Sequence, residues 1–329
     1  MNKKTLLWQI PLAVLLVVGT YFIARQADGK MVKNSDDNQQ YQYDSGMVFG
    51  TTYSVTYKSD VNLQTDIEAE LARIDNEFSM FNANSTVSKL NRGESPELSV
   101  TFREVYNLAK NVNRETDGAF DVTVAPLVNA WGFGFKHEKQ PTAEQVDSLL
   151  KIRSQLDFSA IAKGYGCDAV ASLLRHHDVN DFMVEIGGEI VTHGINPRGG
   201  LWKIGVTRPT EDSLAVDNTL YTVLRVTDIA MATSGNYRNF YYKDGRRYAH
   251  TIDPRTGYPI EHELLSATVL TTRCSVADAY ATSFMVLGLE ASKALLERHP
   301  ELLGYFIYTD ADGSLAVWSS PGLQSMIEQ

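Results

Sequence analysis

Cysteine is scarce in this chain, with Cys167 and Cys274 the only two among 329 residues. A framework of several disulfides is therefore excluded. Both cysteines lie in helix-like stretches among small residues, which favours two buried free thiols. The alternative is a single disulfide between them, if the chain works in an oxidising compartment.

Basic residues are outnumbered by acidic ones. The chain has 30 Lys and Arg against 40 Asp and Glu, which gives a formal net charge of -10. Binding to nucleic acid depends on a basic face that neutralises phosphates, so we expect no nucleic-acid partner. Hydrophobic residues make up 43% of the chain, which suits a globular protein with a substantial core.

Two common phosphate-binding signatures are missing. The stretch LDFSAIAKGYGCDAV, residues 156–170, places glycines and Lys163 at the start of a predicted helix. Backbone N–H groups at a helix N-terminus suit a phosphate. The stretch has neither the G-K-[ST] ending of a Walker loop nor the G-x-G-x-x-G of a dinucleotide-binding fold. By itself it therefore identifies no particular ligand.

The N-terminal region is the clearest break in composition. Residues 6–24 carry no charge, and Lys3 and Lys4 precede them. About 20 apolar residues span a bilayer, and lysines before such a stretch favour a cytoplasmic N-terminus. We favour a retained single-span anchor over a cleaved signal peptide, because we find no convincing small-x-small cleavage site. In both cases we expect the rest of the chain to be exported, with an anchored domain on the periplasmic side of the inner membrane.

The chain then divides into three parts. Residues 1–25 are the signal-anchor or signal segment, and residues 26–45 are a polar tether without apolar periodicity. Residues 46–329 mix helices and strands without regular βαβ alternation and without an internal repeat, so we expect one α+β domain. Among other elements, apolar periodicity predicts helices at residues 63–81, 101–118, 162–179 and 274–288. It predicts strands at residues 51–58, 181–194 and 221–234.

An acid in the helix that starts at Cys274 raises a specific question. Asp278 and Thr282 are one helical turn apart and share a face, while most of their neighbours are small or apolar. A buried carboxylate without a partner is costly, so Asp278 must have one.

Several motifs, in this order and spacing, resemble those of the ApbE-like family, the FAD:protein FMN transferases. The resemblance covers nearly all of the predicted domain. The motifs are FGTTYS, DGAFDVTVAPLVNAWGFG, LDFSAIAKGYGCD, VEIGGEI, ATSGNYRNFY, HTIDPRTGYPI and VADAYATSFMVLG.

The resemblance implies an activity and a site. Family members cleave FAD, place FMN on a Thr or Ser of a partner protein and release AMP, usually with Mg²⁺. The family's metal ligands fall on Asp278, Thr282 and the carbonyl of Ala160. Its flavin-nucleotide contacts fall on Phe49, Phe81, Ala119, Phe120, Asp121, Asp157, Lys163 and Ile252.

Two positions depart from the family pattern. Phe49 stands where many members have methionine, and Phe81 stands where others carry tyrosine. Both changes keep an apolar surface for a ring, although Phe81 loses a hydroxyl. Neither change affects the metal ligands.

A proton acceptor completes the expected chemistry. His250 is the best placed of the seven histidines to take the proton from the incoming hydroxyl, with a structural role as its alternative. We therefore assign His250 and Asp278 as catalytic residues. The expected acceptor is an exported or membrane protein, such as a subunit of a membrane electron-transport complex. The alternative functions are an Mg²⁺-dependent FAD diphosphatase and a non-catalytic exported flavin-binding protein.

Overall fold

The computed structural model describes residues 40–133, 140–152, 155–209, 220–236, 240–243 and 246–328. The predicted membrane segment and residues 26–39 of the predicted tether lie outside these ranges. Within them, the structure has no helix that is long and apolar enough to cross a bilayer.

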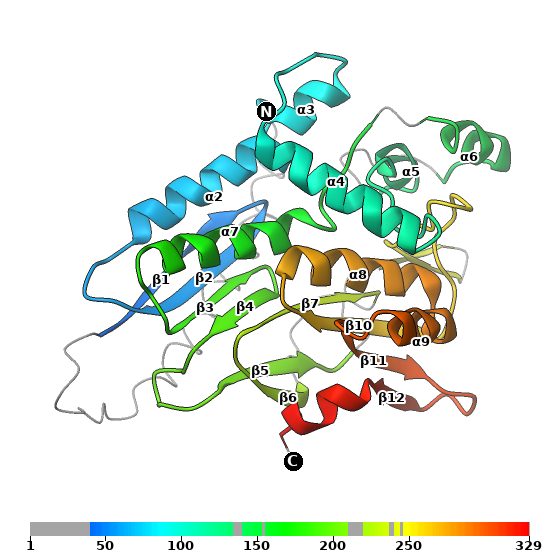
Figure 1. Ribbon diagram of the computed structural model, residues 1–329. Coiled ribbons are helices and arrows are strands. Elements are labelled where there is room, and N and C mark those ends of the chain that lie inside the picture. The colour runs from blue at the N-terminus through cyan, green and yellow to red at the C-terminus, as the bar shows by residue number, and fades with distance from the viewer. Residues whose placement is uncertain are drawn as a thin grey trace, which may run out of the picture. The chain divides into compact units, whose positions relative to one another are not determined.

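An eight-stranded antiparallel sheet forms the centre of the domain (Figure 1). Its strand order is β1-β2-β3-β4-β7-β10-β11-β12, and β5–β6 and β8–β9 form two small sheets. The strands are β1 (Tyr41–Val48), β2 (Thr51–Lys58), β3 (Phe182–Ile186), β4 (Glu189–His193), β5 (Trp202–Thr207), β6 (Leu220–Val226), β7 (Ile229–Gly235), β8 (Phe240–Lys243), β9 (Arg246–Ala249), β10 (Leu264–Thr271), β11 (Leu303–Thr309) and β12 (Leu315–Ser319).

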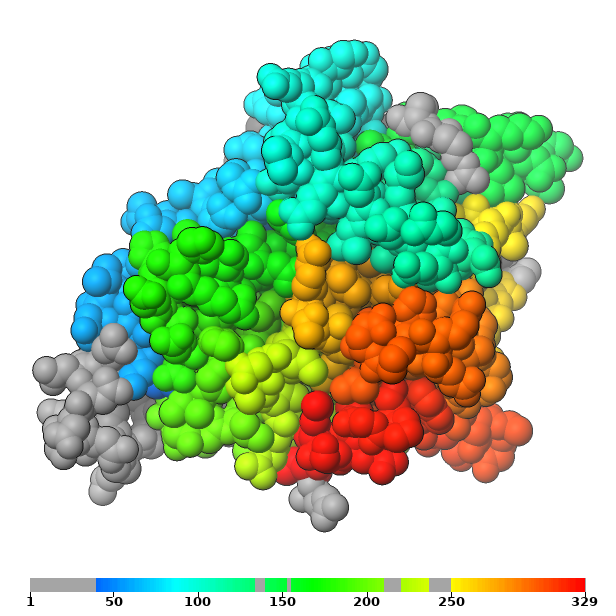
Figure 2. All heavy atoms as spheres, in the orientation of Figure 1, coloured from blue at the N-terminus to red at the C-terminus, as the bar shows by residue number. Residues whose placement is uncertain are grey.

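Helices cover one face of the large sheet (Figure 1). In the same orientation, the segments of α7 (green) and of α8 and α9 (orange) form much of the surface toward the viewer (Figure 2). Helix α7 packs on β3 and β4, and α8 packs on β7 and β10. The helices are α2 (Gln64–Phe78), α3 (Thr86–Asn91), α4 (Val100–Glu115), α5 (Ala125–Ala130), α6 (Ala143–Leu149), α7 (Ala162–His176), α8 (Cys274–Leu287), α9 (Leu289–Arg298) and the 3₁₀ helix η1 (Pro321–Met326).

Strand β11 shows how the sheet builds a core on both faces. Phe306 packs among the residues beneath the helices, whereas Tyr305 and Ile307 join the cluster that contains Trp202 and Leu224 of β5 and β6. Because alternate side chains of a strand point to opposite faces, one strand serves two apolar layers. The predicted mixed α+β architecture is confirmed.

Two predicted strands are each a pair of strands. The range 181–194 turns at Gly187 and Gly188, whose φ angles are 63° and 106°. The range 221–234 turns at Thr227 and Asp228, and Asp228 has a φ of 52°. The prediction of single strands is wrong here because Gly187, Gly188 and Asp228 adopt the left-handed conformation and the chain reverses; the two glycines do so without steric cost.

The domain begins earlier than predicted. Strand β1 starts at Tyr41, so residues 41–45 belong to the sheet and not to the tether. The hydroxyl of Tyr57 on β2 donates a 2.7 Å hydrogen bond to Oδ2 of the buried Asp44. Ladder pairing and this buried contact order a segment whose polar composition suggested a linker.

Candidate active site

Helices α7 and α8 cross, so that Asp278 of α8 lies against the first turn of α7. A Cβ atom added to Gly164 would lie 2.4 Å from the Cys274 carbonyl oxygen and 2.8 Å from Cβ of Asp278. Glycine is therefore required for the two helices to approach this closely. The Gly164 amide donates a 3.0 Å hydrogen bond to Oδ2 of Asp278.

The partners of Asp278 are the Gly164 amide and the ammonium of Lys163, which lies 3.8 Å from Oδ1. The residue is only 2% exposed. Burial raises the pKa of Asp278, and the Lys163 ammonium opposes that shift. The predicted need for a partner is thus met by a neighbouring cation and a helix N-terminal amide.

A second carboxylate, Glu189, pairs with the same lysine. Its Oε1 lies 2.8 Å from Nζ of Lys163, and the residue is 4% exposed. Burial raises the pKa of Glu189 to about 7, while Lys163 opposes the shift. Burial lowers the pKa of Lys163, but the Asp278 and Glu189 carboxylates outweigh burial and raise that pKa overall.

Glu189 was not among the residues predicted from the sequence. It is the first residue of β4, directly after the turn at Gly187 and Gly188. The glycine pair in VEIGGEI, between two alternating runs, is the signal that indicates a hairpin at this point. Once the hairpin is recognised, the acid that follows it lies at a sheet end, beside the start of α7.

The three predicted metal ligands come from neighbouring elements. Thr282 lies one turn after Asp278 on α8, and its Oγ1 is 3.1 Å from the Ser234 hydroxyl on β7. Ala160 lies two residues before Ala162, the first residue of α7. In a regular helix the Gly164 amide would donate to the Ala160 carbonyl four residues earlier, but it donates to Asp278 instead.

These groups fit a magnesium ion. Carboxylate, hydroxyl and carbonyl oxygens are the hard donors that Mg²⁺ takes, and the ion completes its shell with water and phosphate oxygens. When both are ionised, Asp278 and Glu189 carry one negative charge more than Lys163 balances. Within the described residues there is no group of three or more His, Cys, Asp or Glu side chains that would hold a metal. A carboxylate with two uncharged oxygen ligands leaves positions in the ion's shell for water and for phosphate oxygens.

The predicted ring contact Phe49 lies at the turn between β1 and β2, and Phe81 lies in the loop after α2. Phe49 has a φ of 51°, and a Cβ on Gly166 of α7 would lie 3.0 Å from its ring. The ring of Phe81 is 71% exposed and lies close to Gly50. Phe81 therefore offers an exposed aromatic face, whereas Phe49 is partly buried against α7.

The predicted nucleotide contacts between α4 and α5 differ in exposure. Ala119 is 1% and Phe120 is 3% exposed, so a ligand would contact these two residues mainly through their backbone. Asp121 accepts hydrogen bonds from the amide and hydroxyl of Thr123, at 2.8 and 2.7 Å. The Asp157 amide donates to the Val122 carbonyl, so the structure brings the segments of Asp121 and Asp157 together.

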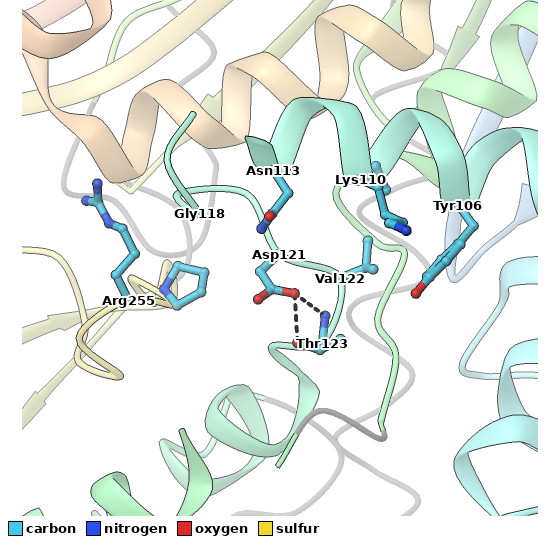
Figure 3. A pocket seen from close by; sticks show the side chains of 10 residues that line it. Tyr106, Lys110, Asn113, Gly118, Asp121, Val122, Thr123 and Arg255 are labelled. Atoms are coloured by element: carbon cyan, nitrogen blue, oxygen red, sulfur yellow. Dashed lines mark hydrogen bonds between the residues drawn. The ribbon is translucent and has the colours of Figure 1, made fainter. Parts of the chain in front are cut away.

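A groove of about 330 Å³ lies beside this segment (Figure 3). Asp121, Lys110 and Arg255 contribute to its lining. The Arg255 guanidinium makes two hydrogen bonds to Asp253, at 2.9 and 2.8 Å, which hold it in the DPRTG turn. The groove therefore combines one acid with two cations.

His250 and Ile252 precede that turn. Ile252 is 5% exposed and packs with Trp131 in a small apolar cluster. The ring of His250 lies 6.4 Å from that of Phe133, edge-on. The Trp131 indole donates to the Gly257 carbonyl at 2.8 Å and ties the turn to the end of α5.

A further acid, Asp168, fixes the start of α8. Its carboxylate accepts hydrogen bonds from the amides of Cys274 and Ser275 and from the Ser275 hydroxyl, at 2.7, 2.9 and 2.6 Å. The negative charge of Asp168 and its hydrogen bonds to two backbone amides stabilise the N-terminus of α8. Cys167 and Cys274 are free and buried, and burial raises the pKa of both thiols.

Comparison with known proteins identifies relatives of the whole domain. A curated FAD:protein FMN transferase of Vibrio cholerae is 36% identical over 81% of this chain and 87% of its own length. The Haemophilus influenzae protein of the same name is 35% identical over 86% of this chain and 91% of its own length. The solved flavin transferase ApbE of Vibrio cholerae superposes with a TM-score of 0.78 at 33% identity, over 88% of this chain and 99% of that chain.

The family comparison agrees with these matches. The sequence model of the ApbE family matches residues 49–307 of this chain, and that range includes every predicted site residue. The resemblance inferred from the motifs is thereby confirmed, and this chain belongs to the ApbE family.

Proposed function

We propose that this chain is an Mg²⁺-dependent FAD:protein FMN transferase. The hydroxyl oxygen of a Thr or Ser on an acceptor protein attacks the FMN phosphorus of FAD. The phosphorus–oxygen bond to AMP breaks, AMP leaves, and the acceptor carries FMN through a phosphoester. Relatives of this name, 31–36% identical over most of both chains, support the activity.

The observation that carries the metal dependence is the buried Asp278 carboxylate at the first turn of α7, beside Lys163. Asp278, Thr282 and the Ala160 carbonyl would hold the ion. When bound, Mg²⁺ supplies positive charge that neutralises the phosphoryl oxygens. The Lys163 ammonium adds a fixed positive charge next to the same place, so it would help to hold the pyrophosphate.

His250 would accept the proton of the incoming hydroxyl on a ring nitrogen. Its partial burial beside Phe133 restricts the ring, which favours one orientation. A positioned base of this kind contributes about 10²–10⁴ to a rate. The groove beside Asp121, with Lys110 and Arg255, lies next to the predicted nucleotide contacts and offers charges of both signs.

Two other functions use parts of the same site. A diphosphatase would pass FMN to water, and a flavin-binding protein would leave FAD intact. Incubation of the full-length chain with FAD, Mg²⁺ and a candidate exported acceptor separates the three. Flavin fluorescence on the denatured acceptor supports transfer, free FMN alone supports hydrolysis, and intact FAD supports binding only.

We also propose that the protein is held in the inner membrane by residues 6–24, with its domain on the periplasmic side. The apolar stretch and the preceding Lys3 and Lys4 support this orientation. The acceptor would then be an exported or membrane protein, such as a subunit of an electron-transport complex. Protease added to spheroplasts should digest the domain, and protection of the domain would contradict the orientation.

A further inference from the structure

We propose that Glu189 is a positioning residue that maintains the Mg²⁺ affinity of Asp278 by neutralising Lys163. The inference rests on the proposed function, because it concerns the metal site assigned to Asp278, Thr282 and Ala160. It assigns a role to a buried acid that neither the metal ligands nor the nucleotide contacts include.

The geometry places Lys163 between two carboxylates. Its Nζ is 2.8 Å from Oε1 of Glu189 and 3.8 Å from Oδ1 of Asp278. The lysine is therefore closer to Glu189 than to the predicted metal ligand. Both acids are at most 4% exposed, so water screens these charges poorly.

The charges explain why a metal site needs the second acid. An ammonium beside a metal ligand repels an incoming divalent cation and competes for the ligand's oxygen. With Glu189 ionised, the three side chains carry one net negative charge, which attracts Mg²⁺. Without that charge, Lys163 and Asp278 would neutralise each other and the attraction would fall.

The hydrogen bonding of Glu189 argues against a purely structural role. Its Oε2 is buried and has no hydrogen-bond partner among the described residues. An unsatisfied buried carboxylate oxygen costs stability, so the side chain is a poor choice for packing alone. The backbone of Glu189 is fixed independently, because it pairs with Ile186 and its carbonyl accepts a hydrogen bond from the Cys167 thiol.

A calorimetric titration with MgCl₂ in the absence of FAD tests the inference on the full-length chain. Glu189→Gln keeps the size and an acceptor for Lys163 but removes the charge. Loss of a residue that supports a metal ligand typically weakens metal affinity about 10–100-fold, and we expect a loss in that range. The control is Glu185→Gln on the neighbouring strand β3, where the carboxylate accepts from the Ser54 hydroxyl and the affinity should not change.

The double variant Lys163→Met with Glu189→Gln separates charge from structure. It restores the single net negative charge, so its Mg²⁺ affinity should return to within about threefold of the unaltered chain. The single variant Lys163→Met should bind Mg²⁺ more tightly than the unaltered chain, because two negative charges then remain. A structural defect caused by Glu189→Gln would not be repaired by removing the lysine.

Three results would overturn the inference: unchanged affinity in Glu189→Gln, a double variant as weak as the single one, or no Mg²⁺ binding by the unaltered chain. The proposed function has a separate readout, the transfer of flavin to an acceptor. Flavin transfer by the unaltered chain together with unchanged Mg²⁺ affinity in Glu189→Gln would reject the inference alone. Absence of transfer with the predicted affinities would reject the function alone.

Discussion

The Gly164 amide on the first turn of α7 donates a 3.0 Å hydrogen bond to Oδ2 of Asp278 on α8. This contact joins the two helices where the predicted metal ligands lie. The amide of a helix N-terminus has no partner within its own helix, so a carboxylate from another helix satisfies it. The hydrogen bond orients the carboxylate through Oδ2, and the other oxygen, Oδ1, lies 3.8 Å from Nζ of Lys163.

Substitution of Asp278 tests its role as a metal ligand. Asp278→Asn keeps an oxygen that accepts from Gly164, but it removes the charge that attracts Mg²⁺. We expect flavin transfer to fall by at least about 10²-fold, with a change in melting temperature of only a few degrees.

Chelation provides the matching test on the unaltered chain. EDTA should abolish transfer, and excess Mg²⁺ should restore it. An unaltered chain that works normally in EDTA, together with a strongly destabilised asparagine variant, would make Asp278 a structural acid.

Substitution of Gly164 tests the close approach of the helices. Gly164→Ala puts a methyl group 2.4 Å from the Cys274 carbonyl oxygen, so the helices must separate. Overpacking of this kind costs about 1–3 kcal/mol of unfolding free energy, and movement of Asp278 should also reduce transfer. Denaturant unfolding measures the first effect. Gly200→Ala is the control, because its nearest atom, Nδ2 of Asn196, would lie 3.9 Å from the added Cβ, and this variant should retain full stability and activity.

Substitution of His250 tests the proton acceptor. His250→Ala should slow flavin transfer about 10²–10⁴-fold, while the FAD dissociation constant stays within a few-fold. Single-turnover kinetics and fluorescence titration with FAD measure the two quantities separately. An unchanged rate of flavin transfer in His250→Ala would indicate that His250 has a structural role before the DPRTG turn.

Buried tyrosines predict a loss of stability at high pH. Burial raises the pKa of Tyr57 to about 12, and Tyr53 and Tyr305 are raised to the same value. Above pH 10 these phenols ionise first in the unfolded chain, so the native state binds more protons and the unfolding free energy falls. It should begin to fall above about pH 8.5, where the two buried thiols ionise first in the unfolded chain, and fall more steeply between about pH 10 and 12.

A variant identifies the contribution of Tyr57. Its hydroxyl donates to Asp44 and accepts from the Leu63 amide, both at 2.7 Å. Tyr57→Phe leaves Oδ2 of Asp44 and the Leu63 amide without this partner, so we expect a loss of about 1–3 kcal/mol at neutral pH and a shallower decrease above pH 10. Urea unfolding across this pH range measures both. An unchanged slope would show that Tyr57 does not take part in the alkaline transition.

The sequence was sufficient for features that depend on local periodicity. In α2, the apolar positions Ile67, Leu71, Ile74 and Phe78 recur at helical spacing, and the structure buries all four. Asp278 and Thr282 share a face of α8 for the same reason, since residues four apart on a helix are neighbours. The ordered motifs were enough to indicate the family, because each of them combines residues that packing alone does not demand.

Only the tertiary structure decided which groups face one another. Glu189 and Lys163 are far apart in the chain, and their ion pair depends on the reversal at Gly187 and Gly188. The alternation of apolar residues continues across that turn, so the pattern of 181–194 predicts one strand where the chain forms two. Likewise, Asp278 reaches the Gly164 amide only because two distant helices cross at a residue without a side chain. Apolar periodicity shows which face of a helix or strand is buried. The partner of a buried charge depends instead on how separate segments pack together.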